Sequence, residues 1–237
     1  MKFGAVGDLH GDFDALDRIM SRHPDVNFWV CPGDLASEDG EYPRPPVPLY
    51  WIKGNNEDFD FVSKQPPGAG TIPNLHYIPN GISLQAGGIT LAGLGGTFAP
   101  TWYDKPAAEL PGPRLATRAR AKGDDKRRHF VQQEVDACKQ LTAVDVFLSH
   151  EAARPFLLPS RQKAGPSRPI DAGKTPINEV LAAMQPRVHL FGHHHRYCEA
   201  VRQQVPSIGL EMVSDSYLIF DGRSLAHERM TTEKGQG

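Results

Sequence analysis

Residues 2–10 read KFGAVGDLH, a short apolar run that ends in an aspartate and a histidine. The apolar part predicts a buried strand over residues 2–7. In extended backbone, side chains two positions apart point to the same side. We therefore expect Asp8 and His10 to face a common centre just beyond the strand, with Leu9 pointing away.

The same arrangement recurs wherever the sequence predicts another short apolar strand. Strands predicted over residues 26–31, 49–53, 144–149 and 188–191 are followed, respectively, by Gly33-Asp34, Gly54-Asn55-Asn56-Glu57, His150 and Gly192-His193-His194-His195. The spacing rule again predicts that His193 and His195 converge. A helix predicted over residues 13–22 and another over 176–184 alternate with these strands, which favours an α/β fold. Loops at the carboxyl ends of strands are where open α/β sheets place ligands.

The side chains gathered in this way are carboxylates, an amide and imidazoles. Such oxygen and nitrogen donors suit Mn²⁺, Fe or Zn²⁺ better than copper(I) or an iron–sulfur cluster. The three cysteines, Cys31, Cys138 and Cys198, are too scattered for a thiolate site or a disulfide framework. We expect divalent metal binding, with Mn²⁺ as the first choice and Fe or Zn²⁺ as alternatives.

The order Asp-x-His, Gly-Asp, Gly-Asn, lone His, Gly-His-x-His resembles the calcineurin-like metallophosphoesterase superfamily, and the match extends from Asp8 to His195. The resemblance implies a four-layer α/β fold, a central β-sandwich of two mixed sheets flanked by helices. It also implies a dinuclear metal centre that hydrolyses phosphate esters through a metal-bridging hydroxide. Carried over by position, the first metal would be held by Asp8, His10 and His195, the second by Asn55, His150 and His193, and Asp34 would bridge them.

The resemblance implies Asp34, His150 and Asn56 as catalytic residues, but Asn56 departs from the pattern. The superfamily has a histidine at this position, and the resemblance implies that this histidine protonates the leaving group or stabilises the transition state. An amide donates a hydrogen bond and cannot transfer a proton near pH 7. This change shifts the expectation toward phosphodiesters or good leaving groups, or a proton from elsewhere, for which His76 and His129 are candidates. Asp12 and Glu57 are candidates to orient ligand imidazoles, the alternative for Asp12 being a helix cap.

Several stretches look like the catalytic domain of RNA lariat-debranching enzymes. They are residues 48–57 (PLYWIKGNNE), 73–78, 89–98 (ITLAGLGGTF), 127–135 and 145–150 (DVFLSH). Those enzymes usually have cysteine in place of the first aspartate, whereas this chain has Asp8. The substrate expected is a phosphodiester in a nucleotide, RNA or DNA. The alternatives are a phosphomonoesterase, including a protein phosphatase, and a metal-binding interaction scaffold.

The chain has 237 residues and a formal net charge of −2, which argues against wholesale DNA coating. Residues 111–174 nevertheless carry 13 basic and 7 acidic side chains. We interpret this segment either as a solvated surface or as a wall for an anionic substrate, with Arg127, Arg128 and Arg154 contacting phosphate. No apolar run is long enough for a membrane helix, and the amino terminus lacks a secretory signal, so a cytoplasmic protein without a membrane partner is expected. The oligomeric state is not predicted.

We expect one domain over residues 1–230 and a flexible tail over 231–237. Asn80-Gly81 and Gly87-Gly88 predict hairpins between three strands at 75–94. The prolines between residues 100 and 113 predict irregular backbone, residues 126–141 a helix, and residues 151–174 a long loop. His189, inside a predicted strand, is expected to be a packed core histidine.

Overall fold

The computed structural model describes residues 1–113, 124–159 and 169–233, and its centre is a pair of six-stranded sheets. The first sheet has the order β14 (His227–Thr231), β13 (Ser216–Asp221), β1 (Lys2–Val6), β2 (Val26–Cys31), β3 (Leu49–Trp51) and β4 (Leu75–Tyr77). The second has the order β11 (Cys198–Arg202), β12 (Val205–Gly209), β10 (Val188–Phe191), β7 (Val146–Ser149), β6 (Ile89–Leu94) and β5 (Ser83–Ala86). Both sheets are mixed. Strands β1 to β4 in the first and β12, β10, β7 and β6 in the second run parallel, and the other strands pair antiparallel at the edges.

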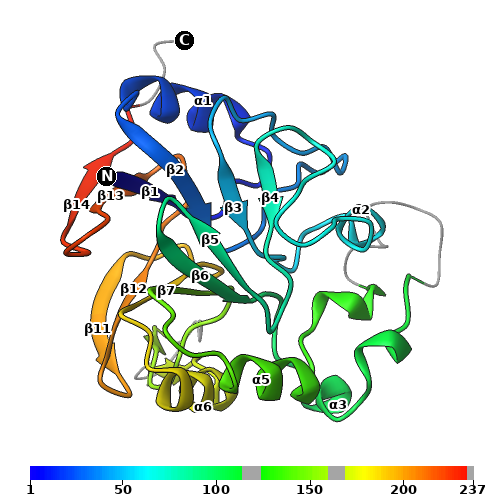
Figure 1. Cartoon of the computed structure of the whole chain (residues 1–237). Helices are drawn as coiled ribbons and strands as arrows, with labels where there is room; N and C mark the ends of the chain where they lie inside the picture. Colours follow the sequence, from blue (N-terminus) through cyan, green and yellow to red (C-terminus); the bar gives the residue numbers. More distant parts are fainter. Residues whose placement is uncertain (114–123, 160–168, 234–237) are drawn as a thin grey trace.

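Helices cover the outer face of each sheet. Helix α1 (Phe13–Arg22) and the short α2 (Phe59–Val62) pack on the first sheet, and α5 (Gln132–Lys139) and α6 (Thr175–Met184) pack on the second. Figure 1 shows α1 at the top of the molecule and α5 and α6 at the bottom, with both sheets between them. The predicted four-layer β-sandwich is therefore confirmed.

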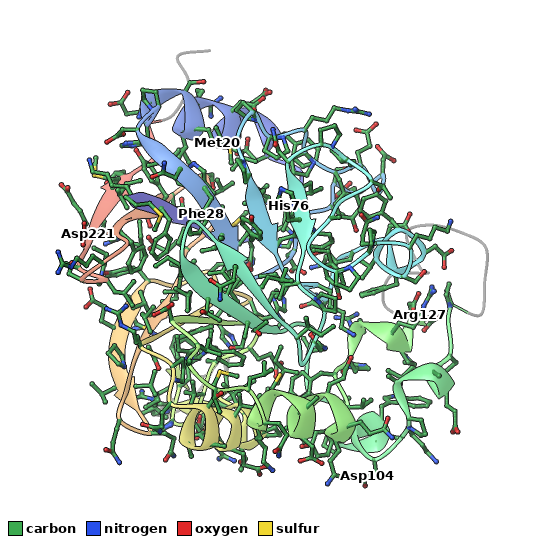
Figure 2. All side chains as sticks on the ribbon, viewed as in Figure 1. Met20, Phe28, His76, Asp104, Arg127 and Asp221 are labelled. Carbon is green, nitrogen blue, oxygen red and sulfur yellow. The ribbon has the colours of Figure 1, made fainter. Side chains whose placement is uncertain are left out.

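Three apolar layers hold this arrangement together. Leu16 and Ile19 of α1 pack against Trp29 in the layer under α1, which also includes Met20, labelled in Figure 2. A second layer fills the space between the sheets and includes Phe28 of β2. The third lies under α5 and α6. Removing a large apolar side chain from water stabilises a fold by about 1.5–3 kcal/mol, so these layers fix the sheets that carry the loops described below.

The parallel strands bring the predicted polar loops to one edge. Cys31 of β2 pairs with Trp51 of β3, and Ser149 of β7 pairs with Phe191 of β10. In each pair both residues are the last of their strands, so the loops that follow leave each sheet at the same level. The sequence positions that follow these strands are therefore neighbours in space, although they are far apart along the chain.

The hairpin predicted at Gly87-Gly88 is confirmed, because β5 and β6 pair antiparallel across it. The hairpin predicted at Asn80-Gly81 is wrong, since β4 and β5 belong to different sheets. The Asn80 side chain instead bonds both backbone groups of Gly95, accepting from its N–H at 2.6 Å and donating to its carbonyl at 3.1 Å. This turn transfers the chain from the first sheet to the second.

Two other local predictions need correction. The irregular segment predicted after residue 100 contains α3 (Pro100–Tyr103) and a 3₁₀ turn, η1 (Ala107–Glu109). Pro100 is at the first helical turn, where a missing N–H has no cost. The helix predicted over 126–141 is divided into η2 (Lys126–Arg128) and α5, because the backbone of Thr97 bonds to Arg128 and Phe130 and draws the chain out between them.

The predicted long loop and tail also contain regular structure. Strands β8 (Leu157–Leu158) and β9 (Ile170–Asp171) form a small antiparallel sheet within residues 151–174. Part of the basic segment, residues 114–123 and 160–168, lies outside the described residues. At the carboxyl end, Thr231 belongs to β14, and the buried Thr232 donates its hydroxyl to the carbonyl of Val213 at 2.7 Å. The chain is thus held in the fold to residue 232, and residues 234–237 of the predicted tail lie outside the described part.

Candidate metal centre

One group of potential ligands joins the loop after β1 to the loop after β10. Nε2 of His195 lies 2.9 Å from Oδ2 of Asp8 and 3.1 Å from Nε2 of His10. Suitable ligand atoms of these three side chains all lie within 4.8 Å of one another. Asp8 is buried, and His195 is exposed, so the group forms an open-sided site at the surface.

A second group joins the loops after β2, β7 and β10. Nε2 of the buried His150 lies 3.5 Å from Oδ1 of Asp34, and the rings of His150 and His193 are 4.9 Å apart. Oδ1 of Asn55 lies 3.0 Å from Nε2 of His150. Asp34, His150 and His193 satisfy the same 4.8 Å criterion as the first group.

Asp34 lies between the two groups. Its Oδ1 faces His150 of the second, and its Oδ2 is 3.7 Å from Nε2 of His10 in the first. The structure therefore brings the whole predicted ligand set together: Asp8, His10, Asp34, Asn55, His150, His193 and His195.

The backbone at these residues is not extended. His10, Asp34, His193 and His195 have φ values of 47, 55, 66 and 49°, in the left-handed region that residues other than glycine adopt uncommonly. The prediction that spacing along an extended strand makes His193 and His195 converge is therefore wrong, because they turn into different groups. Backbone strain of this kind costs on the order of 1–3 kcal/mol per residue and persists only where the surroundings enforce it.

Two glycines make room for the carboxylates. A Cβ atom on Gly54 would lie 2.0 Å from Oδ1 of Asp34, and one on Gly192 would lie 2.3 Å from Oδ1 of Asp8. Real side chains do not approach so closely. The glycines next to the predicted ligands thus allow the backbone to pass directly over the buried carboxylates.

Hydrogen-bond donors fix the orientation of the site's acceptors. The backbone N–H groups of Asn55 and Asn56 donate to Oδ1 of Asp34 at 2.7 and 2.8 Å, and the Asn56 side chain donates to Oδ2 at 2.8 Å. The N–H of His193 donates to Oδ2 of Asp8 at 2.8 Å. The carboxylates are therefore held in place by groups that belong to the loops themselves.

The electrostatics favour positive charge between the carboxylates. Burial opposes ionisation of Asp34, yet His150 and the Asn56 donors hold the pKa of Asp34 below its ordinary value. Burial also opposes charge on His150, but Asp34 and Asp8 raise its pKa. Burial, followed by repulsion from His150, lowers the pKa of His193 to about 3. A neutral imidazole such as His193 is the form that binds a metal ion.

The donor set fits a cation on geometric grounds as well. Nδ1 of His150 lies 2.8 Å from the carbonyl of Pro32, which only accepts, so this nitrogen carries hydrogen. In the neutral ring Nε2 then carries no hydrogen, and its lone pair faces two further acceptors, Oδ1 of Asn55 and Oδ1 of Asp34. Oδ1 of Asp8 is also buried without a hydrogen-bond partner. Acceptors that face one another in this way need a proton or a metal ion between them.

Glu57 and Asp12 have different roles from the predicted orientation of imidazoles. The buried Glu57 accepts from the N–H groups of Leu35, Ala36 and Gly54, and so ties the loop after β2 to the loop after β3. Burial, with repulsion from Asp34, raises the pKa of Glu57 to about 7. Asp12 caps α1 by accepting from the N–H of Ala15 at 3.0 Å, which was the alternative.

Sequence reasoning missed Glu151, which directly follows His150. The residue is only 3% exposed. Its carboxylate accepts from the N–H of Phe98 at 3.1 Å and lies 3.7 Å from Nζ of Lys174 and 3.9 Å from Nε2 of His193. Burial raises the pKa of Glu151 to about 7. No sequence pattern marks this residue, because the groups that enclose it come from distant segments.

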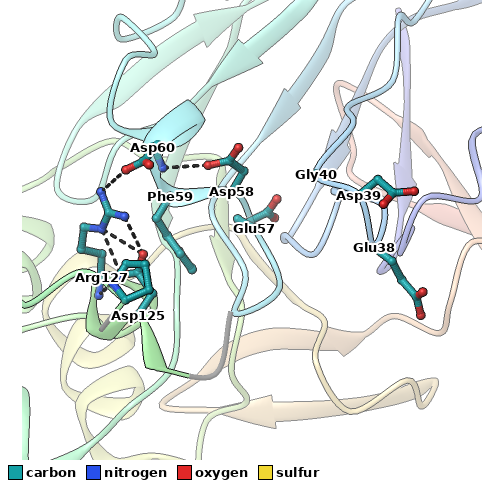
Figure 3. A pocket seen from close by; sticks show the side chains of 10 residues that line it. Glu38, Asp39, Gly40, Glu57, Asp58, Phe59, Asp60, Asp125 and Arg127 are labelled. Carbon is teal, nitrogen blue, oxygen red and sulfur yellow. Dashed lines mark hydrogen bonds and ion pairs between the residues drawn. The ribbon is translucent and has the colours of Figure 1, made fainter. Parts of the chain in front are cut away.

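The predicted phosphate contacts do not gather at the centre in the same way. The Arg127 guanidinium bonds both carboxylate oxygens of Asp125 and Oδ1 of Asp60, beside a cavity of about 270 Å³ that is lined by other acidic side chains (Figure 3). Nε of Arg154 donates to Oδ2 of Asp171 at 2.9 Å, next to β9. Arg128, at the end of η2, precedes the bridge to Thr97. The charges of Arg127 and Arg154 are thus already compensated.

The two histidines proposed as substitutes for the missing acid make contacts of their own. His76 on β4 stacks on Tyr50, and its Nδ1 lies 2.9 Å from the carbonyl of Gly68. Nδ1 of His129 lies 3.0 Å from Oγ1 of Thr97, and burial lowers the pKa of His129 to about 4. Both rings are engaged with residues outside the two ligand groups.

A two-sheet sandwich with paired acid and histidine groups at the strand ends defines a metal-dependent phosphoester hydrolase. Comparison with known proteins agrees with this class: the model of the calcineurin-like phosphoesterase family matches residues 1–197, and the chain belongs to that family. Among the described residues, no helix is long and apolar enough to cross a bilayer.

Curated relatives include the lariat debranching enzymes of Drosophila melanogaster and Schizosaccharomyces pombe. They are 28% and 24% identical to this chain over 82% and 81% of its length. The human lariat debranching enzyme is 24% identical over 65% of the chain. The chain spans 43% of the fly and yeast proteins and 33% of the human one, so it corresponds to less than half of each.

Solved structures share the fold at low sequence identity. The TT1561 protein of Thermus thermophilus superimposes with a TM-score of 0.63 at 12% identity, covering 98% of this chain and 99% of that protein. A putative 5′-nucleotidase from Staphylococcus aureus gives a TM-score of 0.51 at 14% identity, covering 99% of this chain and 55% of that one. These likenesses establish the architecture alone.

Proposed function

We propose that the two ligand groups bind two divalent metal ions, Mn²⁺ in the first instance, and that the protein hydrolyses a phosphodiester. The observation that carries the proposal is the position of Asp34, whose two oxygens face different groups, at 3.7 Å from His10 and 3.5 Å from His150. Asp8, His10 and His195 would hold one ion and Asn55, His150 and His193 the other, with Asp34 between them.

Bound divalent ions lower the pKa of water and neutralise charge on phosphoryl oxygens. The chain's own groups define where this chemistry would take place. Glycines and backbone N–H groups keep Asp8 and Asp34 in place, and Nδ1–H of His150 donates to Pro32 so that its Nε2 points into the site. Ligand positions fixed before the reaction need no reorganisation during it.

The preference for a diester rests on Asn56. Its amide is bonded to Asp34 at 2.8 Å and supplies a hydrogen bond but no proton. His76 and His129, the other candidates for an acid, are engaged elsewhere. A substrate whose leaving group departs without protonation by the protein therefore suits this site best. The relatives named lariat debranching enzymes support a diester in a nucleotide or nucleic acid.

The experiment compares bis-p-nitrophenyl phosphate with p-nitrophenyl phosphate, using metal-free protein to which Mn²⁺ is returned. Asp34→Asn is the matched variant, because it keeps an acceptor for the N–H groups of Asn55 and Asn56 and removes the charge and the second oxygen, which faces the first group. We expect two bound Mn²⁺ per chain, faster turnover of the diester, and loss of both properties in Asp34→Asn.

The outcomes separate the alternatives. Faster turnover of the monoester would favour a phosphomonoesterase or protein phosphatase. Two bound Mn²⁺ without turnover of either ester would favour the metal-binding scaffold. Failure to bind Mn²⁺ at all would contradict the proposal as a whole.

A further inference from the structure

His189 is a buried polar side chain that no step of the proposed hydrolysis uses. It lies on β10, opposite Ser207 of β12 and Phe147 of β7, and is 0% exposed. The rings of Phe147 and Phe191 stack on it at 5.5 Å each. A polar ring in such apolar surroundings is tolerated only when its nitrogens are hydrogen-bonded.

Both nitrogens of His189 have hydrogen-bond partners, and the bonds that lead from His189 through Ser149 to Glu151 have a fixed direction. The Ser149 hydroxyl lies 2.5 Å from the carbonyl of Glu151, which only accepts, so the hydroxyl donates to it. Oγ of Ser149 must then accept the hydrogen of Nε2 of His189 at 2.7 Å. Burial lowers the pKa of His189 to about 3, so the ring is neutral and Nδ1 is an acceptor. The single hydrogen of the Ser207 hydroxyl is within reach of this nitrogen, at 3.1 Å, and of the carbonyl of Val205, at 3.2 Å.

The series of hydrogen bonds from His189 through Ser149 ends on the turn that carries His150 of the second ligand group. The carbonyl of Glu151 follows His150 directly, at the point where the backbone leaves β7. The same turn places Nε2 of His150 beside Asp34 and the Glu151 carboxylate 3.9 Å from Nε2 of His193. The position of His150 therefore depends directly on where the turn lies, and His193 lies next to the carboxylate that the turn carries. The hydrogen bonds that link Ser207, His189, Ser149 and Glu151 involve none of the first group, Asp8, His10 and His195.

We propose that His189 is a positioning residue for the second metal site, acting through Ser149 on the turn that carries His150 and Glu151. This inference rests on the proposed function. Residues that orient metal ligands typically change metal affinity or activity by about 10–100-fold when they are replaced. The distinguishing expectation is asymmetry: the second site weakens and the first keeps its affinity.

The test uses a matched pair of variants at His189. His189→Gln keeps an N–H donor near the position of Nε2 and should preserve the bond to Ser149, whereas His189→Leu removes it. Mn²⁺ binding is measured by titration calorimetry, and paired Mn²⁺ ions are detected by the exchange-coupled signal in electron paramagnetic resonance. We expect His189→Leu to weaken one of two sites by at least about tenfold and to lose the coupled signal at stoichiometric Mn²⁺. Excess Mn²⁺ should restore the signal, and His189→Gln should stay within about threefold of the parent protein.

Two further variants keep the test decisive if His189→Leu folds poorly. Ser149→Ala removes the same bond from its other side and should give the same asymmetric loss. Val180→Ala opens a cavity in the layer under α6 without touching the chain of bonds, and serves as the control for lost stability. A general loss of stability, as in Val180→Ala, should affect both sites equally. The inference is overturned if His189→Leu or Ser149→Ala weakens neither site, or weakens both sites equally. Failure of the parent protein to bind two Mn²⁺ would instead contradict the proposed function.

Discussion

The side-chain amide of Asn56 donates to Oδ2 of Asp34 across 2.8 Å, so the residue that replaces the expected histidine is tied to the carboxylate between the two ligand groups. Hydrogen bonds to charged groups contribute about 1.5–3 kcal/mol. We expect Asn56→Ala to lower kcat on bis-p-nitrophenyl phosphate by about 10–100-fold. Steady-state kinetics at saturating Mn²⁺ check this. An unchanged kcat would show that the bond does not support the reaction.

Replacing Asn56 by histidine should raise activity and change the selectivity for the leaving group. An imidazole at this position adds a group that transfers protons near neutral pH, which contributes about 10²–10⁴-fold where it protonates a leaving group. Asn56→His should therefore gain most on esters with alkyl leaving groups and little on p-nitrophenyl esters. The ratio of kcat/KM for the two classes measures the effect. Equal gains on both would contradict the assignment of position 56 as the place where the acid is missing.

Gly192→Ala tests the close passage of the backbone over Asp8. The new Cβ would meet Oδ1 of Asp8 at 2.3 Å and Cγ of Pro32 at 3.2 Å, so the carboxylate must move. We expect the variant to fold and to lose one of two Mn²⁺ ions, measured by metal analysis after gel filtration.

Gly112→Ala is the matched control, since a Cβ there has ordinary contacts with Arg127 that begin at 3.6 Å. It should bind Mn²⁺ as the parent protein does. If Gly192→Ala also retains both ions, Asp8 is not held as described.

The site was predictable from sequence to the extent that parallel strands end at a common edge. Asp8, Asp34 and His150 each follow an apolar strand, and that pattern is local. The left-handed backbone at His10 and His193 has no such local signature, because the residue types alone do not require a positive φ. The spacing argument consequently failed where the loops turn, although the ligands themselves were found.

Features that depend on residues distant in the sequence could not be predicted from local sequence patterns. Asn80-Gly81 has the composition of a hairpin, and only its bonds to Gly95 make it a passage between sheets. Glu151 has the sequence of an ordinary surface acid, and its burial comes from Phe98 and Lys174, which approach through the tertiary fold.

Arg127→Ala separates a structural role from a role in binding phosphate. Asp125 is 4% exposed, and the Arg127 guanidinium bonds both of its carboxylate oxygens. Removing a charged partner from a buried acceptor costs about 1–3 kcal/mol. We expect the free energy of unfolding to fall by that amount while KM stays within about twofold. The exposed Arg154→Ala is the control, with a smaller loss of stability. A large rise in KM at unchanged stability would instead support the predicted phosphate contact.

His189 should make stability depend on pH in a defined direction. Burial lowers its pKa to about 3 in the folded protein, while the unfolded chain keeps the ordinary value of about 6.5. Between these values the unfolded chain binds more protons, so the free energy of unfolding decreases as pH falls from 6.5 toward 3. Well inside this window the contribution approaches about 1.4 kcal/mol per pH unit.

The His189→Gln variant lacks the titrating ring and should show a shallower loss than the parent protein. Urea unfolding in EDTA at pH 7.5, 6.5, 5.5 and 4.5 measures the difference, and the chelator prevents metal binding from adding its own pH dependence. Ser207→Ala is the control, because it removes a hydrogen-bond partner and keeps the imidazole, so its slope should match that of the parent. Parallel slopes for the parent and His189→Gln would mean that His189 is protonated in the folded state. Its Nδ1 would then be a donor, and its assignment as an acceptor would be wrong, whereas Nε2 would still donate to Ser149.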